Sequence, residues 1–116
     1  MFHRVGLRVG AKISEGEYER ALIFCGTGMG IHIAASKCPH VHSAVVESVP
    51  AGLRCITGNN CNVLAMGGNI VAYDLACRMT EAFVETDFTE GFDPATAQDL
   101  KNYFAQMETV DGETHK

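Results

Sequence analysis

The chain has no tryptophan, only three prolines and few charged residues, and none of its apolar runs is long. A membrane-spanning helix needs about 20 apolar residues, so no span is expected. Lysine and arginine together number nine, nowhere cluster, and are outweighed by acidic residues, giving a formal net charge of −5. This balance disfavours nucleic-acid binding. Met1–Lys12 also lacks the apolar core and cleavage site of a signal peptide.

No C-x-x-C pair occurs among the five cysteines, which are Cys25, Cys38, Cys55, Cys61 and Cys77. Their odd number and irregular spacing disfavour a disulfide framework. The pattern is typical of a reducing compartment, so we expect a cytoplasmic protein with mostly buried thiols. Cys55, Cys61 and Cys77 are expected to act as small buried apolar groups.

Short apolar runs alternate with helical segments along the chain. Its 116 residues, with 47% hydrophobic content, suffice for one domain. The predicted strands are residues 21–26, 43–48 and 62–68. The predicted helices are about 3–13, 30–37, 50–56, 72–85 and 94–107. The strands are apolar almost throughout, as in parallel sheets covered on both faces, and the alternation predicts an α/β fold with an open parallel sheet.

The last predicted helix has clear start signals. Asp93 is expected to cap it and Pro94 to take the first helical position. Its inward-facing residues should be Leu100, Phe104 and Met107. We expect a single domain over residues 1–108, followed by a polar, frayed tail over residues 109–116.

A glycine-rich turn, CGTGMG, follows the first predicted strand from Cys25 to Gly30. Ligands of parallel sheets bind beyond the carboxyl ends of the strands. Glycines at alternate positions let backbone N–H groups approach an anion, and the following helix directs its positive end there. The same environment should lower the pKa of Cys25 below about 8.5. A thiolate beside such donors could remove a proton next to a carbonyl, and Thr27 adds a hydroxyl for a substrate oxygen.

Two other interpretations of this turn are open. The first is a tight strand-to-helix turn with a buried cysteine. The second is a dinucleotide site, which needs G-x-G-x-x-G and an acidic residue about 20 positions later. Glu47 lies at a suitable distance, but the spacing here is G-x-G-x-G and Ile31 stands where the third glycine would be.

The chain resembles the sugar-phosphate isomerases of the ribose-5-phosphate isomerase B and galactose-6-phosphate isomerase (RpiB/LacA/LacB) family over about Val5 to Leu100. The resemblance is carried, in order, by CGTGMGIHIAASK, SAVVESV, GNNCNVLAMGG and ETDFTEGFDP. It implies a Rossmann-like α/β/α sandwich that isomerises a phosphorylated aldose or ketose through a cis-enediolate. It also implies a homodimer or homotetramer whose subunits share the active site, with no metal or organic cofactor.

The resemblance also implies roles for individual residues. Cys25 would be the proton-transfer base, and Thr27 would contact the substrate through its hydroxyl. The implied substrate-binding residues are Gly26, Gly28, Met29, Gly30 and Asn59, of which the first four form the anion hole.

The chain departs from the family at Gly58, where relatives carry the histidine that opens the sugar ring. Ribose 5-phosphate needs this opening step. A tetrose 4-phosphate has its O4 esterified and cannot close a five-membered ring. The combination ESV and NNCNVL also looks like the erythrulose-4-phosphate isomerase branch. We therefore favour an open-chain tetrose phosphate over ribose 5-phosphate.

A second departure concerns both ends of the family pattern. The family's first strand with its Asp-His pair, the next helix and the second strand all lie upstream of the position of Met1. The arginines that clamp phosphate have no counterpart in residues 91–110. These features predict an N-terminally shortened member. The alternative to an active isomerase is a non-catalytic relative that keeps the fold and its self-association surface.

Five other side chains suggest chemistry. Cys38, His40 and His42 lie close together in sequence, but no second ligand pair stands at zinc-finger spacing, so loop and strand-edge histidines are favoured over a metal site. His32 could face the pocket as an auxiliary acid or base, and should stay neutral near a helix N-terminus. Arg54 is the best local candidate for phosphate binding.

Overall fold

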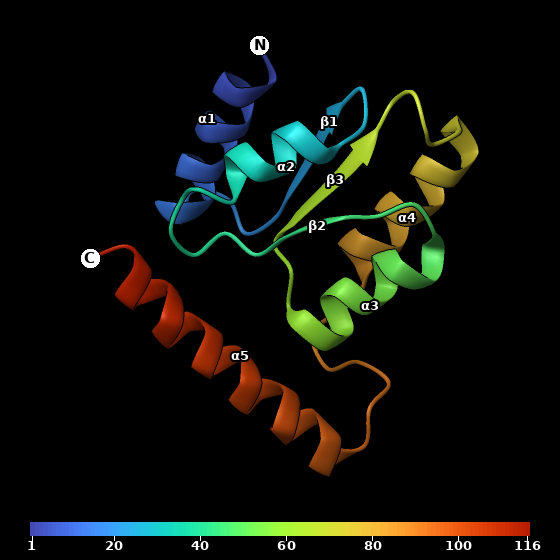
Figure 1. The fold of residues 1–116 in the computed structure, drawn as a ribbon. Coiled ribbons are helices and arrows are strands. Elements are labelled where there is room, and N and C mark those ends of the chain that lie inside the picture. The colour runs from blue at the N-terminus through green and yellow to red at the C-terminus, as the bar shows by residue number, and fades with distance from the viewer.

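The computed structural model describes residues 1–116 and consists of three parallel strands and five helices (Figure 1). The strands are β1 (Ala21–Cys25), β2 (Ser43–Val45) and β3 (Val63–Gly67). The helices are α1 (Phe2–Ser14), α2 (Met29–Ala35), α3 (Val49–Asn59), α4 (Tyr73–Glu85) and α5 (Pro94–Thr114). The sheet order is β1-β3-β2 with all strands parallel, which confirms the predicted α/β class.

β3 is the central strand, and all five of its residues are buried. Val63 and Ala65 join the apolar cluster on one face of the sheet, whereas Leu64 and Met66 join the cluster on the other face. This alternation explains why the strand sequence is apolar throughout: both faces are covered.

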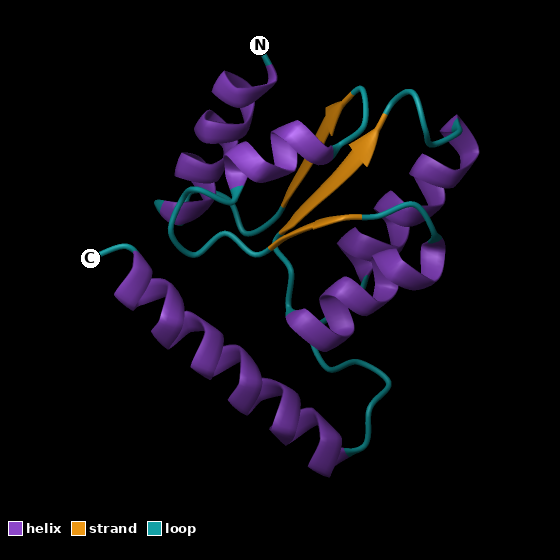
Figure 2. Cartoon of the chain, in the orientation of Figure 1, coloured by secondary structure: helices purple, strands orange, loops and turns teal.

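Helices cover the two faces of the sheet in pairs (Figure 2). α1 and α2 pack on one face, with Ile13, Ile23 and Ile31 in the shared core. α3 and α4 pack on the other, where Met79 and Phe83 are fully buried. The result is the α/β/α sandwich that the sequence predicted.

The second strand is shorter than predicted. The sheet pairing ends at Val45, because the chain then turns into α3. Ser48 is the N-cap of that helix, and its hydroxyl accepts a hydrogen bond from the Ala51 N–H at 3.2 Å. α3 then continues to Asn59 and ends at Asn60, which takes the left-handed conformation common at helix C-termini.

Residues 109–114, expected to belong to a polar, frayed tail, are helical. α5 continues through Thr114, with the hydroxyls of Thr109 and Thr114 bonded to carbonyls one turn earlier. Its expected start is confirmed, because the Asp93 carboxylate accepts a hydrogen bond from the Thr96 N–H at 3.1 Å. A cap and further contacts along the helix hold a segment that its polar composition alone would leave frayed.

α5 lies against the body of the chain without a buried residue (Figure 1). Phe104 contacts the rings of His42 and Phe88, but Met107 is 56% exposed rather than turned inward as expected. None of the helices has the length and apolar character that a bilayer crossing requires.

The cysteines divide between core and surface. Cys55 and Cys61 are buried as expected, but Cys77 is exposed. Cys77 lies two residues before the buried Met79 on α4, which places it on the opposite side of the helix.

Candidate active site

The glycine turn lies at the carboxyl end of β1 and packs directly against the backbone that follows β3. Gly28 has a φ of 81°, and a Cβ there would lie 2.8 Å from the carbonyl carbon of Met66. A Cβ on Gly67 would lie 2.6 Å from the carbonyl carbon of Thr27. Real side chains do not approach backbone this closely. Glycine is therefore required on both sides of this contact.

Two backbone hydrogen bonds join the two loops. The Gly68 N–H donates to the Cys25 carbonyl at 2.8 Å, and the Asn69 N–H donates to the Gly26 carbonyl at 3.0 Å. These bonds fix the turn to the most buried strand of the sheet, so the position of Cys25 is set by the core.

The thiol of Cys25 is surrounded by backbone donors. The Gly28 N–H points at its Sγ at a distance of 3.1 Å. The pKa of Cys25 is lowered, most strongly by a backbone hydrogen bond from Ile31, against the opposing effect of partial burial and with the help of bonds from Thr27, Gly28 and Gly30. The predicted direction of the shift is thus confirmed. These amides stabilise the thiolate form of Cys25.

The site is accessible from solvent. Cys25 is half-buried, and both Thr27 and Met29 are exposed. The Thr27 Oγ1 accepts a hydrogen bond from the Met29 N–H at 3.2 Å, so its own O–H remains available to a ligand oxygen.

Two residues beside the turn were missed by the sequence interpretation. The Asn69 Nδ2 lies 3.1 Å from the position of a Cβ on Gly26, and the Phe2 ring lies 2.8 Å from the corresponding position on Gly30. Asn69 could have been found, because it follows the carboxyl end of the central strand. Phe2 could not, since its approach depends on how α1 packs against α2.

Asn59 is not brought to Cys25 within one chain. It ends α3 and precedes β3, so it lies at the amino edge of the sheet, opposite the edge that carries the turn (Figure 1). There it lines a cavity of about 470 Å³ together with His42, Cys55 and Phe104.

The other candidate side chains have structural contacts. The His32 Nδ1 lies 2.7 Å from the Ser43 Oγ, and burial lowers the pKa of His32, which agrees in direction with the expected neutral ring. The Arg54 guanidinium lies over the Phe92 ring at 4.7 Å, and Arg54 is exposed to solvent.

Cys38 does not join the two histidines that follow it. Its Sγ faces the Leu7 carbonyl of α1 at 3.7 Å, and burial raises the pKa of its thiol. His40 and His42 turn instead toward α5, where both contact Glu108.

Residues 1–102 match the sequence model of the family described as Ribose/Galactose Isomerase. The chain is 46% identical over 90 residues to 4-deoxy-4-sulfo-D-erythrose isomerase of Clostridium sp. (strain MSTE9), covering 78% of this chain and 57% of that protein. It is 32% identical over 100 residues to D-erythrulose-4-phosphate isomerase 2 of Mycolicibacterium smegmatis, covering 86% of this chain and 63% of that protein. The chain thus spans less than two thirds of the length of either relative.

The fold also matches solved structures. Ribose-5-phosphate isomerase B of Clostridium thermocellum superposes with a TM-score of 0.86 at 26% identity, covering 98% of this chain and 72% of that chain. The corresponding enzyme of Thermotoga maritima gives a TM-score of 0.81 at 21% identity, covering 94% of this chain and 70% of that chain, a likeness of fold alone.

Proposed function

The chain belongs to the ribose/galactose isomerase family, and on this basis we propose that it interconverts an aldose and a ketose that carry a terminal anionic group. The observation that carries the proposal is the position of the Cys25 thiol, half-buried at the carboxyl edge of the sheet among backbone N–H donors.

In the proposed reaction the Cys25 thiolate removes the proton from the carbon next to the carbonyl and becomes a thiol. The electron pair of that C–H bond forms a double bond between the two carbons, and the π pair of the carbonyl moves onto its oxygen, which gives a cis-enediolate. The thiol returns the proton to the neighbouring carbon, while the hydroxyl proton passes between the two oxygens. N–H groups of the turn from Gly26 to Gly30 hold the developing oxyanion, and the free Thr27 O–H donates to a substrate oxygen.

A lowered pKa has two opposite effects on Cys25 as a base: it increases the amount of thiolate but decreases the basicity of that thiolate. It raises the fraction of Cys25 that is thiolate at a given pH, so more of the base is present before substrate arrives. The same hydrogen bonds weaken the base. We therefore propose that the substrate oxygen competes for some of these N–H groups when it binds, which would make the thiolate more basic at the moment of proton transfer.

The proposed substrate is a four-carbon sugar in its open-chain form. Gly58 offers no ring-opening acid or base, and two relatives have names that specify four-carbon substrates. A tetrose 4-phosphate remains the leading candidate. The relative that is 46% identical favours a second candidate, in which a C4 sulfonate replaces the phosphate.

We also propose that a second copy completes the site. Asn59 and Cys25 lie at opposite edges of the sheet, so both reach one substrate only if they come from different copies. Exposed apolar side chains could form the contact, among them Phe24 at the free edge of β1 and Tyr103, Met107 and Val110 on α5.

The primary test measures isomerisation of D-erythrulose 4-phosphate, 4-deoxy-4-sulfo-D-erythrose and ribose 5-phosphate by the purified chain. One four-carbon substrate should be turned over far better than ribose 5-phosphate. Cys25→Ser should lower kcat by about 10²–10⁴, the usual contribution of a proton-transfer group, whereas the exposed Cys77→Ser should not. Absence of activity with all three substrates would favour the non-catalytic alternative, whereas activity unaffected by Cys25→Ser would show that another group is the base.

Sharing of the site is tested by mixing two inactive variants, Cys25→Ala and Asn59→Ala. If each site takes one residue from each copy, random exchange of subunits between dimers makes about a quarter of all sites intact. If both residues act within one chain, every site in the mixture stays defective and no activity returns.

A further inference from the structure

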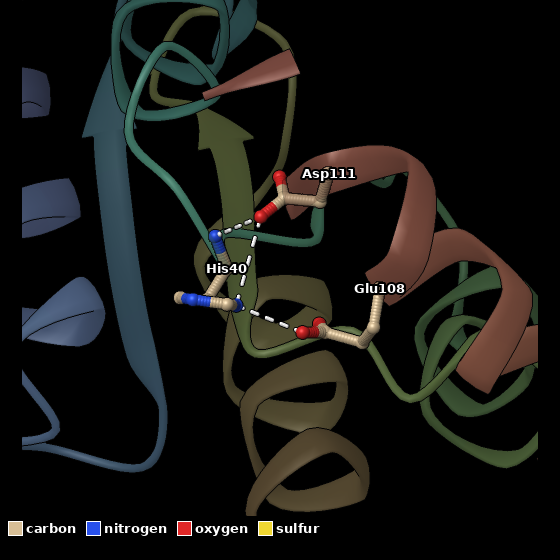
Figure 3. A group of neighbouring side chains, drawn as sticks. All are labelled: His40, Glu108 and Asp111. Atoms are coloured by element: carbon tan, nitrogen blue, oxygen red, sulfur yellow. Dashed lines mark hydrogen bonds and ion pairs between the residues drawn. The ribbon is translucent and has the colours of Figure 1, made fainter. Parts of the chain in front are cut away.

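His40 of the CPHVH segment meets two carboxylates from α5, a helix about 70 residues further along the chain (Figure 3). The His40 Nδ1 lies 2.8 Å from the Glu108 Oε2 and 3.6 Å from the Asp111 Oδ2. The His42 Nε2 contacts the second oxygen of Glu108. The ligand atoms of His40, Glu108 and Asp111 all lie within 4.8 Å of one another.

The cluster carries negative charge that no lysine or arginine balances. The ion-pair partners of Glu108 and Asp111 are histidines only, namely His40, His42 and His115. The side chains of Glu108 and Asp111 are only 30% and 14% exposed, which limits their screening by water.

The backbone around His40 is held in place before any ion binds. His40 has a φ of 63°, an uncommon conformation outside glycine. Its N–H donates to the Asp111 Oδ2 at 2.8 Å, and its carbonyl accepts from the Asn62 Nδ2 at 2.8 Å. The other end of the Asn62 amide accepts from the His42 N–H at 2.8 Å. This network directs the His40 ring toward α5.

We propose that His40, Glu108 and Asp111 bind a divalent transition-metal ion, with Zn²⁺ the first to test. One imidazole and two carboxylates form a mixed nitrogen and oxygen donor set that suits such ions. Ligands about 2.0–2.1 Å from a tetrahedral Zn²⁺ lie about 3.3 Å apart, and the two separations from the His40 Nδ1 fall on either side of this value. His42 holds the second oxygen of Glu108 and thereby orients that ligand.

The ion would fasten α5 to the loop that precedes β2. α5 has no buried residue, so these polar contacts supply much of its attachment. The cluster lies at the amino edge of the sheet, away from the Cys25 of the same chain, and its neighbour His42 lines the cavity that also contains Asn59.

The test is a calorimetric titration of the metal-free chain with Zn²⁺, together with thermal unfolding in the presence and absence of the ion. The wild-type chain should bind about one Zn²⁺ and unfold at a higher temperature when it is bound. His40→Asn and Asp111→Asn should each weaken binding by about 100-fold or more, and His42→Gln by about 10-fold. Asn tolerates the left-handed backbone at position 40, and the remaining amide oxygen at position 111 can still accept from the His40 N–H.

Asp99→Asn on the exposed part of α5 and His3→Asn on α1 are the matched controls, and neither should change Zn²⁺ affinity. The proposal is overturned if the wild-type chain binds no Zn²⁺. It is equally overturned if folded Asp111→Asn binds as tightly as the wild type, or if the controls weaken binding as much as the cluster variants do.

Discussion

Replacing Gly67 with alanine should both destabilise the fold and alter the reactivity of Cys25. The new Cβ would lie 2.6 Å from the Thr27 carbonyl carbon and 2.7 Å from its Cα and oxygen. All three are backbone atoms, so no side chain can rotate aside, and overpacking of this kind costs about 1–3 kcal/mol. Separation of the loops would also weaken two backbone hydrogen bonds worth about 1 kcal/mol each. We expect a total loss of about 3 kcal/mol.

Gly68→Ala is the matched control. A Cβ there meets only the Cys25 carbonyl oxygen at 3.7 Å, an ordinary contact. Its free energy of unfolding should stay within about 1 kcal/mol of the wild type, because alanine also restricts the unfolded chain. With a urea m-value of about 1–3 kcal/mol/M, Gly67→Ala should lower the midpoint of unfolding by about 1–3 M.

The same pair of variants reports on the thiol. In Gly67→Ala the turn is displaced, so fewer backbone N–H groups should donate to the Cys25 thiol. The pH midpoint for alkylation of Cys25 by iodoacetamide should then rise toward the ordinary thiol value. In Gly68→Ala it should stay at the wild-type value. Equal urea midpoints for the two variants, with unchanged alkylation profiles, would refute the close contact between these loops.

Four further predictions concern the thiol, a helix cap and the core. In the wild type, alkylation of Cys25 should have a lower pH midpoint than that of the exposed Cys77, because backbone donors lower the pKa of Cys25, and a midpoint at or above that of Cys77 would contradict this. By linkage, the stability difference between the wild type and Cys25→Ser should grow as pH rises from the lowered pKa toward about 8.5, and should vanish below it. Ser48→Ala should cost about 1 kcal/mol in urea unfolding, since it removes the acceptor for the Ala51 N–H; no loss would show that the cap is dispensable. Phe83→Ala should cost about 3–5 kcal/mol in the same assay, because the side chain is fully buried, and a loss below about 1 kcal/mol would mean that this core is loosely packed.

Local patterns were enough to predict the sheet and the turn. Continuous apolar runs identified buried parallel strands, and the glycine spacing after β1 indicated both a close backbone approach and a lowered pKa at Cys25. The N-cap at Asp93 was also readable from sequence, since a cap depends on residues three positions apart.

Long-range packing could not be predicted in the same way. The extension of α5 through Thr114 depends partly on a hydrogen bond between Asp111 and His40, 71 residues apart. His40 and His42 likewise contact Glu108 across a long separation in the sequence, and Phe2 approaches Gly30 only because α1 packs against α2. The separation of Asn59 from Cys25 follows from the fold: Asn59 ends α3 at the amino edge of the sheet, whereas Cys25 ends β1 at the carboxyl edge.

The central claim is that Cys25 moves a proton between neighbouring carbons of the substrate. It is tested most directly by following deuterium incorporation from D₂O into the four-carbon substrate by NMR, with the wild type and with Cys25→Ala. The wild type should exchange the hydrogen next to the carbonyl, and Cys25→Ala should do so about 10²–10⁴ times more slowly. Exchange at the same rate in both proteins would show that another group is the base.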